Sequence, residues 1–455
     1  MNKALYILTA YVVLLGGSYY AYHLILPIRV SAHIIALIVL LAYLYRAGIP
    51  NHPLTLGAVV SLAALLLAIP GSLDPRMALE NGWTWFINSL LLLALIQLCR
   101  SGYAPTLFQA HYLIGGLVAL LALAEFLITL RRPLGLFGSI SITGAYLAAL
   151  VVPVAHAYRV SEGRPRLACR VLLILLIVAV GVGDNRGAYL SAGVGVLVYI
   201  TLMWRAPLIR KAALWAMLGA GLLAVLIVLT DKRGHAAGDP LRLDLWMAGL
   251  KMLTTYPRGV GPGLFAQGYR LFGSMGFNQF ADAHNHYITL GAELGLAGLA
   301  AGALVLILFV YCARRFSLLP SQKAALAALV GIGAHMVGDS FPVTGFVFLV
   351  ALYVAYITYP VEITFSPAAR KLITGAALLI LAGWTYQMLR YDLAQVHYER
   401  ALKSGAVSEA MAASDLDPHL NLYSLELARL HDPQFIPARE DLGLYGLTMY
   451  GRVFK

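Results

Sequence analysis

The sequence predicts an all-α polytopic membrane protein with about twelve or thirteen transmembrane helices. Of its 455 residues, 60% are hydrophobic and only 12% are charged, whereas soluble domains are roughly half apolar and about a quarter charged. Unpaired backbone groups are costly in hydrocarbon, so such a chain crosses the membrane as helices or as a closed barrel. The apolar stretches are long and continuous rather than alternating, which favours helices.

Apolar runs of about 20 residues, the length that crosses a bilayer, recur along the chain. The first run follows Lys3, is too long for a signal-peptide core and has no clear cleavage site, so we expect a retained helix. The expected spans are 4–26, 30–46, 54–70, 83–99, 107–130, 137–158, 167–183, 187–204, 211–230, 286–312, 322–339, 342–359 and 371–390.

Four regions follow from this pattern. Residues 1–230 form N-terminal transmembrane helices, 231–285 a periplasmic loop with the catalytic segment, 286–390 C-terminal transmembrane helices, and 391–455 a small helical tail. The long loop is rich in aromatic residues and glycines, which is typical of a functional loop rather than a disordered one. The tail is expected to form a helix, a turn at Asp417 and a second helix.

Lysines and arginines gather in every second loop, and by the positive-inside rule these loops face the cytoplasm of a bacterial inner membrane. The formal net charge of +12 is therefore spread over short loops, and no nucleic acid is expected as a partner. An arginine in a loop on the other side of the membrane goes against this rule, so its presence there needs another explanation. Five residues are in that position: Arg29, Arg76, Arg131, Arg132 and Arg186.

His284 is the strongest candidate for chemistry. It lies in Ala-His-Asn-His-Tyr directly before a span, beside the glycine-rich loop, where a neutral imidazole can act as a base. A histidine at a membrane boundary is also often only an interfacial residue. A metal site is the rival interpretation, but His284 and His286 are two apart, which suits no helical ligand pair. His335 and Asp339 share a helical face on another span and can simply bond each other. We expect no metal and no cofactor.

Several cations are expected around the same loop. Taken singly, each is an ordinary boundary charge, and nearby aspartates such as Asp184, Asp239 and Asp244 can neutralise it. Together they suit a lipid pyrophosphate, because planar guanidinium groups match phosphate oxygens in pairs. The candidates are Arg186, Arg242, Lys251, Arg131 and Arg132.

Carboxylates inside or near spans need partners. For Glu125 and Glu293 we expect an arginine or a tyrosine as the partner. Asp415 and Asp417 have the spacing of the metal-binding pair of nucleotide-sugar transferases. They precede a proline in the tail, so a helix-terminating turn is the better interpretation.

Three ordered segments resemble the O-antigen ligase and polymerase superfamily. The first is Asn185-Arg186-Gly187, similar to the family's Ser-Arg-Gly. The second is Arg242 four residues before Trp246, followed by a segment from Pro257 to Phe265 that is similar to P-x-G-x-G-x-x-F. The third is His284-Asn285 with Gly295 and Gly298 at the family spacing. The chain departs from the family at Asn185, and where Asn-Pro-Asn often follows Gly-x-Phe it has Ser139, Ser141 and Thr143.

The resemblance implies a GT-C-like membrane glycosyltransferase that uses an undecaprenyl-pyrophosphate-linked glycan and no nucleotide sugar. We expect an inverting O-antigen ligase that transfers the glycan to the lipid A core at the periplasmic face, among membrane lipids. His284 would be the base, Arg186 and Arg242 the pyrophosphate clamp, and Asp339 an orienting partner. Arg131, Arg132, Lys251, Asn285 and Asp339 would be the substrate-binding residues.

Three alternatives stay open. Within the superfamily these are a protein O-oligosaccharyltransferase, which the hairpin-like tail favours, and an O-antigen polymerase. Outside it, a transporter could carry an anionic substrate past the same arginines. A transporter is expected to show paired broken helices in two related halves, and the sequence shows no convincing internal repeat.

Overall fold

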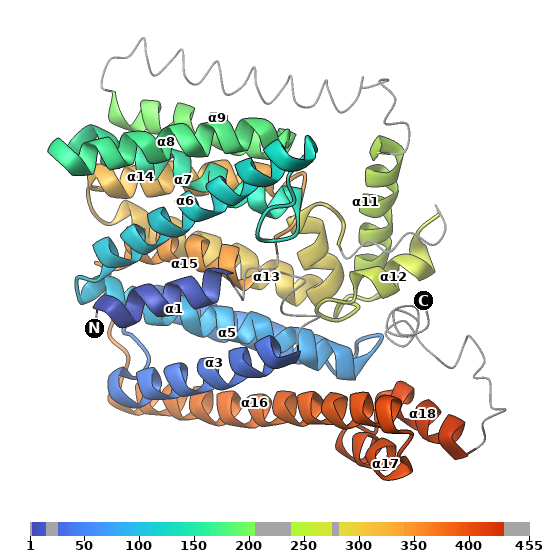
Figure 1. Cartoon of the computed structure of the whole chain (residues 1–455). Coiled ribbons are helices and arrows are strands. Elements are labelled where there is room, and N and C mark those ends of the chain that lie inside the picture. Colours follow the sequence, from blue (N-terminus) through green and yellow to red (C-terminus); the bar gives the residue numbers. More distant parts are fainter. Residues whose placement is uncertain (1, 15–25, 205–237, 275–281, 342, 432–455) are drawn as a thin grey trace.

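A computed structural model describes residues 2–14, 26–204, 238–274, 282–341 and 343–431. Every regular element among these residues is a helix, so the prediction of an all-α protein is confirmed. Most of the helices run side by side in one bundle, and α11 stands at one end of it (Figure 1). The described helices are α1 (Asn2–Leu14), α3 (Leu26–Ala47), α4 (Pro53–Ala68), α5 (Pro75–Arg100), α6 (Ala104–Thr129), α7 (Ile140–Val160), α8 (Gly163–Gly183), α9 (Arg186–Met203), α11 (Gly238–Thr255), α12 (Phe265–Phe272), α13 (His286–Arg314), α14 (Pro320–His335), α15 (Thr344–Thr358), α16 (Pro367–Ser404), α17 (Val407–Leu416) and α18 (Asn421–His431).

Eight of the described helices are long and apolar enough to cross a membrane, and α1, α4 and α15 are shorter apolar helices. Each predicted span overlaps a described helix except 211–230, which lies outside the described residues. The chain is therefore multi-pass, while the expected total of twelve or thirteen crossings stays a prediction.

Local capping chemistry moves two of the predicted boundaries. Helix α5 begins at Pro75, eight residues before the predicted span, because the Asp74 side chain accepts the amide hydrogen of Met77 as an N-cap. Helix α16 runs unbroken past residue 390 to Ser404, where Gly405 ends it in the left-handed conformation. The last span and the first helix of the tail are thus one helix.

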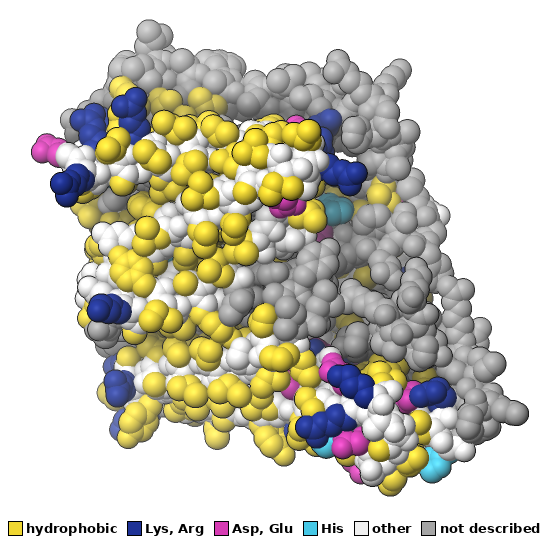
Figure 2. Space-filling view, in the orientation of Figure 1, with side chains coloured by type: hydrophobic (Ala, Val, Ile, Leu, Met, Phe, Trp, Pro, Cys, Tyr) yellow, Lys and Arg dark blue, Asp and Glu magenta, His cyan; other side chains and the backbone are white. Residues whose placement is uncertain are grey.

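The outside of the bundle is apolar, as lipid contact requires. Figure 2 shows hydrophobic side chains covering the helices, with lysines and arginines along the left margin and over the tail. On α6 the exposed residues Leu113, Leu117, Leu120 and Leu121 share one face. Soluble monomers rarely expose apolar surface of this extent.

Arginines pair with backbone carbonyls at one end of the bundle, which we call the basic end (left in Figure 1). Arg100 donates to the carbonyl of Tyr359 at 2.9 Å and to that of Val361 at 2.7 Å. Arg370 donates to the carbonyl of Ala47 at 2.6 Å. These bonds satisfy carbonyl groups that helix C-termini leave open. Helices α11, α12, α17 and α18 lie at the opposite end, which we call the site end (Figure 1).

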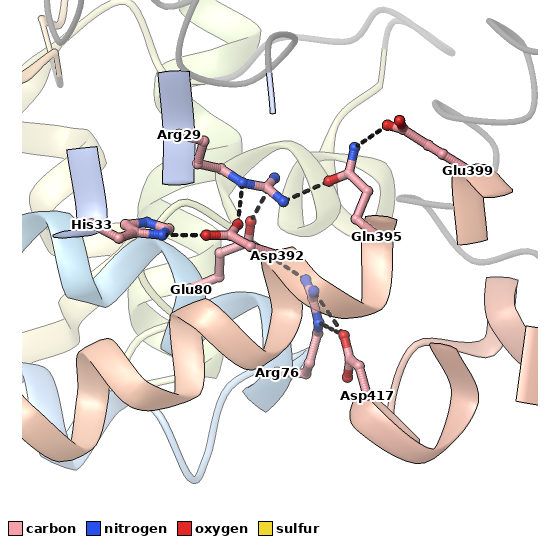
Figure 3. Close-up of polar contacts among 8 residues, drawn as sticks. All are labelled: Arg29, His33, Arg76, Glu80, Asp392, Gln395, Glu399 and Asp417. Atoms are coloured by element: carbon pink, nitrogen blue, oxygen red, sulfur yellow. Dashed lines mark hydrogen bonds and ion pairs between the residues drawn. The ribbon is translucent and has the colours of Figure 1, made fainter. Parts of the chain in front are cut away.

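Arg29 belongs to a buried ionic network at the site end (Figure 3). Its Nε donates to Oδ1 of Asp392 at 2.6 Å, and its guanidinium lies 3.7 Å from Glu80. The Nδ1 atom of His33 lies 2.7 Å from the other oxygen of Asp392. The network joins α3, α5 and α16, which explains an arginine on the side that disfavours it.

Arg76 extends the same network to the tail (Figure 3). It pairs with Glu80 and, at 2.9 Å, with Asp417, and its guanidinium lies 4.3 Å from the centre of the Tyr391 ring. Asp417 directly follows α17 and begins a turn, as predicted. The Arg76 ion pair, which the sequence did not indicate, holds the tail against α5.

Candidate active site

The segment before α13 sets the position of His284. Asn285 is the N-cap of α13, and its side-chain oxygen accepts the amide hydrogens of Tyr287 at 3.0 Å and Ile288 at 3.1 Å. His284 therefore lies outside the helix rather than at its start, with a φ of +47°. Its own amide donates to Asp282 at 2.7 Å, which supports this uncommon conformation. Asn285 was expected to bind substrate, but its oxygen caps the helix.

The His284 imidazole faces two carboxylates. Nδ1 lies 3.4 Å from Oδ1 of Asp339 and 3.9 Å from Oδ1 of Asp282, and the imidazole is 39% exposed. A hydrogen bond with Asp339 raises the pKa of His284 above its ordinary value, against burial and the charge of Arg242. Burial raises the pKa of the Asp282 carboxyl to about 6. Because a carboxylate only accepts hydrogen bonds, Nδ1 is the donor and Nε2 is left to take a proton.

Asp339 lies in the connection between α14 and α15, within reach of two further elements. Burial favours the neutral acid, but hydrogen bonds with His284 and Ser141 hold the pKa of Asp339 below its ordinary value. Nδ2 of Asn185 in turn donates to the Ser141 hydroxyl at 3.3 Å. Ser141 stands where the sequence departs from the family pattern, and no signal in the sequence indicated this contact. His335 was expected to bond Asp339, but its Nδ1 has no hydrogen-bond partner among the described residues.

Arg186 and Arg242 approach this centre from two helices. Arg186 is the first residue of α9, where free backbone amides and the helix dipole also favour an anion. Arg242 is exposed on α11, and its charge acts to lower the pKa of His284. Asp244 was expected to neutralise Arg242. Its carboxylate accepts hydrogen bonds from the hydroxyls of Tyr269 and Ser274.

The other predicted cations lie further out. Arg132 pairs with Asp184, the residue before Asn185, so it borders the start of α9. Arg131 is exposed beside it. Lys251 is exposed on α11, nine residues beyond Arg242, a separation of about 13 Å along the helix axis. The structure thus places Arg242 near enough to act on His284 and puts Arg186 next to Asn185, which contacts Ser141, whereas Lys251 lies further along α11.

The glycine-rich loop packs backbone to backbone against a break in α13. Gly295 interrupts the helix with a φ of +65°. The amides of Val260 and Gly261 donate to carbonyls in the turn before the break, at 2.9 and 3.0 Å. A Cβ atom on Gly259 would lie 2.2 Å from the carbonyl oxygen of Glu293, and one on Gly295 would lie 2.2 Å from that of Pro257. Only glycines permit this contact, which explains both glycine positions.

The carboxylates of Glu293, which is buried, and Glu125, which is partly exposed, bond backbone amides instead of the expected arginine or tyrosine. Glu293 accepts from the amide of Gly263 at 2.8 Å and from that of Phe265 at 3.4 Å. Glu125 accepts from the amides of Leu134 and Gly135, at 3.1 and 2.9 Å. Both therefore hold loops that flank the site, and the predicted partners were wrong.

One cluster in the described residues has the composition of a metal site. Ligand atoms of Asp282, His284 and Asp339 all lie within 4.8 Å of one another. His286 is not part of this cluster, because it contacts Ser340 instead. The same three residues also make an ordinary histidine held by two carboxylates.

Residues 171–303 match the family model described as O-antigen ligase. This match supports membership of the chain in the O-antigen ligase superfamily. Members of this superfamily are glycosyltransferase-like enzymes that ligate or polymerise lipid-linked glycans in membranes. A comparison with curated proteins found no significant match.

The O-antigen ligase match covers only part of the described centre. Arg186, Arg242 and His284 fall inside the matched residues, whereas Ser141 and Asp339 fall on either side of them. The structure is therefore what brings Ser141 and Asp339 to the histidine.

Proposed function

We propose that this superfamily member is an O-antigen ligase, which transfers a glycan from undecaprenyl pyrophosphate to a sugar hydroxyl of the lipid A core at the periplasmic face. The observation that carries the proposal is the position of His284. Its Nδ1 is bound by Asp339, its imidazole is partly exposed, and the arginine of α11 is close enough to lower its pKa. A base beside guanidinium groups suits the departure of a pyrophosphate.

The transfer would be a single displacement with inversion. The acceptor hydroxyl oxygen attacks the anomeric carbon, and the bond from that carbon to the pyrophosphate oxygen breaks. Nε2 of His284 takes the hydroxyl proton, while Asp339 fixes the tautomer and stabilises the imidazolium. Arg186 and Arg242 hold the pyrophosphate and stabilise the charge that grows on it. Arg131 and Arg132 would add positive charge at the entrance.

The alternatives predict other features. A protein O-oligosaccharyltransferase would use a serine or threonine as the acceptor, and a polymerase another O-unit. A transporter would need paired broken helices, and among the described helices only α13 has a non-helical residue inside it. Base and cation residues at one end of the bundle favour transfer over transport.

Reconstitution tests the proposal. The purified protein would receive undecaprenyl-pyrophosphate-linked O-antigen together with lipid A core, a serine-containing peptide or a second lipid-linked O-unit, each in excess EDTA. We expect glycosylation of the lipid A core alone and no dependence on a divalent cation. Modification of the peptide or elongation of the O-unit would support the corresponding alternative. Activity that needs added magnesium or manganese would instead favour Asp282, His284 and Asp339 as metal ligands.

A further inference from the structure

A cavity of about 240 Å³ lies beside the segment that carries His284, and Asp282 and His286 line it. Its walls come from α1, α3, α5, α13 and α15, and most of its lining is apolar. On α5 the lining runs from Asn81 to Leu91, a rise of about 15 Å, and on α3 from Ala32 to Leu40, about 12 Å. The cavity therefore runs along the helices, in the direction that a lipid chain takes in a membrane.

Two adjacent pairs of contacting residues, His284 with Asp339 and His286 with Ser340, lie next to the cavity. His284 contacts Asp339, whereas His286 contacts the next residue, Ser340, with Nδ1 3.3 Å from the hydroxyl oxygen. The Ser141 hydroxyl of α7, which lowers the pKa of Asp339, accepts a hydrogen bond at 3.3 Å from Asn185, the N-cap of α9. His286 and Ser340 instead line the cavity. The base thus lies between an arginine side and a cavity side.

The polar end of the cavity does not suit a pyrophosphate. Asp282 and Glu293 contribute carboxyl groups there, and the described lining residues include no lysine or arginine. Oxygens of this kind accept hydrogen bonds from sugar hydroxyls, and the described lining offers a phosphate no cation to pair with. Trp85 and His286 add two nearly parallel rings, with centres 6.4 Å apart and an angle of 14° between their planes. Flat aromatic surfaces and carboxylates together suit the head group of a glycolipid.

We infer that this cavity holds a hydrocarbon chain of the acceptor glycolipid, with its sugar hydroxyl at His284, while the donor pyrophosphate lies on the arginine side. The inference rests on the proposed function and names the side from which each substrate reaches the base. It gives the transfer two separate lipid sites, one with cations and one without. A donor chain in this cavity would have to place its pyrophosphate beside Asp282 and Glu293.

Filling the cavity tests the inference. Ala36 of α3 lines the cavity, whereas Ile38 of the same helix is 61% exposed on its outer face. The variants are Ala36→Phe and, as a matched control, Ile38→Phe, with Ala32→Leu as a milder filling variant if Ala36→Phe is not monodisperse. Binding of two probes, lipid A core and undecaprenyl pyrophosphate, is measured for each variant by native mass spectrometry in detergent.

Ala36→Phe should weaken lipid A core binding by about tenfold or more, because excluding even two methylene groups from an apolar site has that effect. Undecaprenyl pyrophosphate binding should stay within about twofold, and Ile38→Phe should change neither. Weaker undecaprenyl pyrophosphate binding in Ala36→Phe, or unchanged binding of both probes, would overturn the inference. Both probes are scored by binding, so a protein that binds them as expected but transfers no glycan would refute the proposed function alone.

Discussion

Nδ1 of His284 lies 3.4 Å from Oδ1 of Asp339, although 55 positions separate the two residues in the chain. The contact joins the segment before α13 to the connection between α14 and α15. The imidazole stays 39% exposed. Asp339 is thereby a positioning residue, and its effect on the pKa of His284 can be measured.

Asp339→Asn should move the acidic limb of the kcat/KM profile to lower pH. The base works when neutral, so wild-type activity rises as pH passes the raised pKa of His284. The hydrogen bond with Asp339 is the largest cause of that increase, and its loss lowers the pKa. Asp282→Asn should shift the limb in the same direction by less. A limb that stays in place or moves to higher pH in Asp339→Asn would argue against this pair as base and partner.

Gly295→Ala should disrupt the contact between the glycine-rich loop and α13. Gly405→Ala is the matched control, because Gly405 has a φ of +68° but no atom within 4 Å of its added Cβ. The control should lose about 1–2 kcal/mol from the left-handed backbone alone. Gly295→Ala adds the collision with the carbonyl of Pro257 and should lose more stability and most turnover. Thermal unfolding in detergent and turnover are the readouts. Equal effects in the two variants would show that the backbone contact contributes nothing.

Arg29→Met should destabilise the fold without touching the candidate site. Removing Arg29 leaves the buried Asp392 carboxylate with His33 as its remaining side-chain partner, and breaking a buried ion pair costs about 3–5 kcal/mol. The double variant Arg29→Met with Asp392→Leu should recover part of that loss. Lys403→Met, which removes an exposed cation from α16, should have little effect. Thermal unfolding is measured for the wild type and the three variants. A double variant no more stable than Arg29→Met would show that the Arg29–Asp392 ion pair is not the cause of the lost stability.

The sequence predicted what depends on local composition. Long apolar runs located the helices, and the histidine and glycine spacing identified the family. It did not predict contacts between residues far apart in the chain, such as those of Arg29 with Asp392 and of Ser141 with Asp339. Composition near a residue does not say which distant residue it meets.

Backbone geometry was the second limit. The amide partners of Glu125 and Glu293 exist only once the loops have folded, because any residue offers such a group. The positive φ of His284 and the break at Gly295 likewise depend on packing between segments. The glycine at position 295 indicated a close contact but not its partner.

Cysteine labelling tests the sidedness of the bundle. The arginine distribution predicts that the site end faces the periplasm, so Ser404→Cys, at the end of α16, should react with a membrane-impermeant maleimide in intact spheroplasts. Ser101→Cys, exposed at the basic end, should react only after lysis. The native Cys169, which is partly accessible, is replaced by serine in both. The reverse labelling pattern would place the site in the cytoplasm.

Donor affinity beside single-turnover rate, measured for His284→Ala, Arg186→Ala and Arg242→Ala, tests the central claim most directly. His284→Ala should bind donor almost normally while turnover falls by about 10² to 10⁴, the usual range for a positioned base. Both arginine variants should lose donor affinity and turnover together, and lysine should restore them only partly because it lacks the planar fork. Each variant is first shown to be monodisperse in detergent. Loss of donor binding in His284→Ala with normal binding in both arginine variants would contradict the assigned roles.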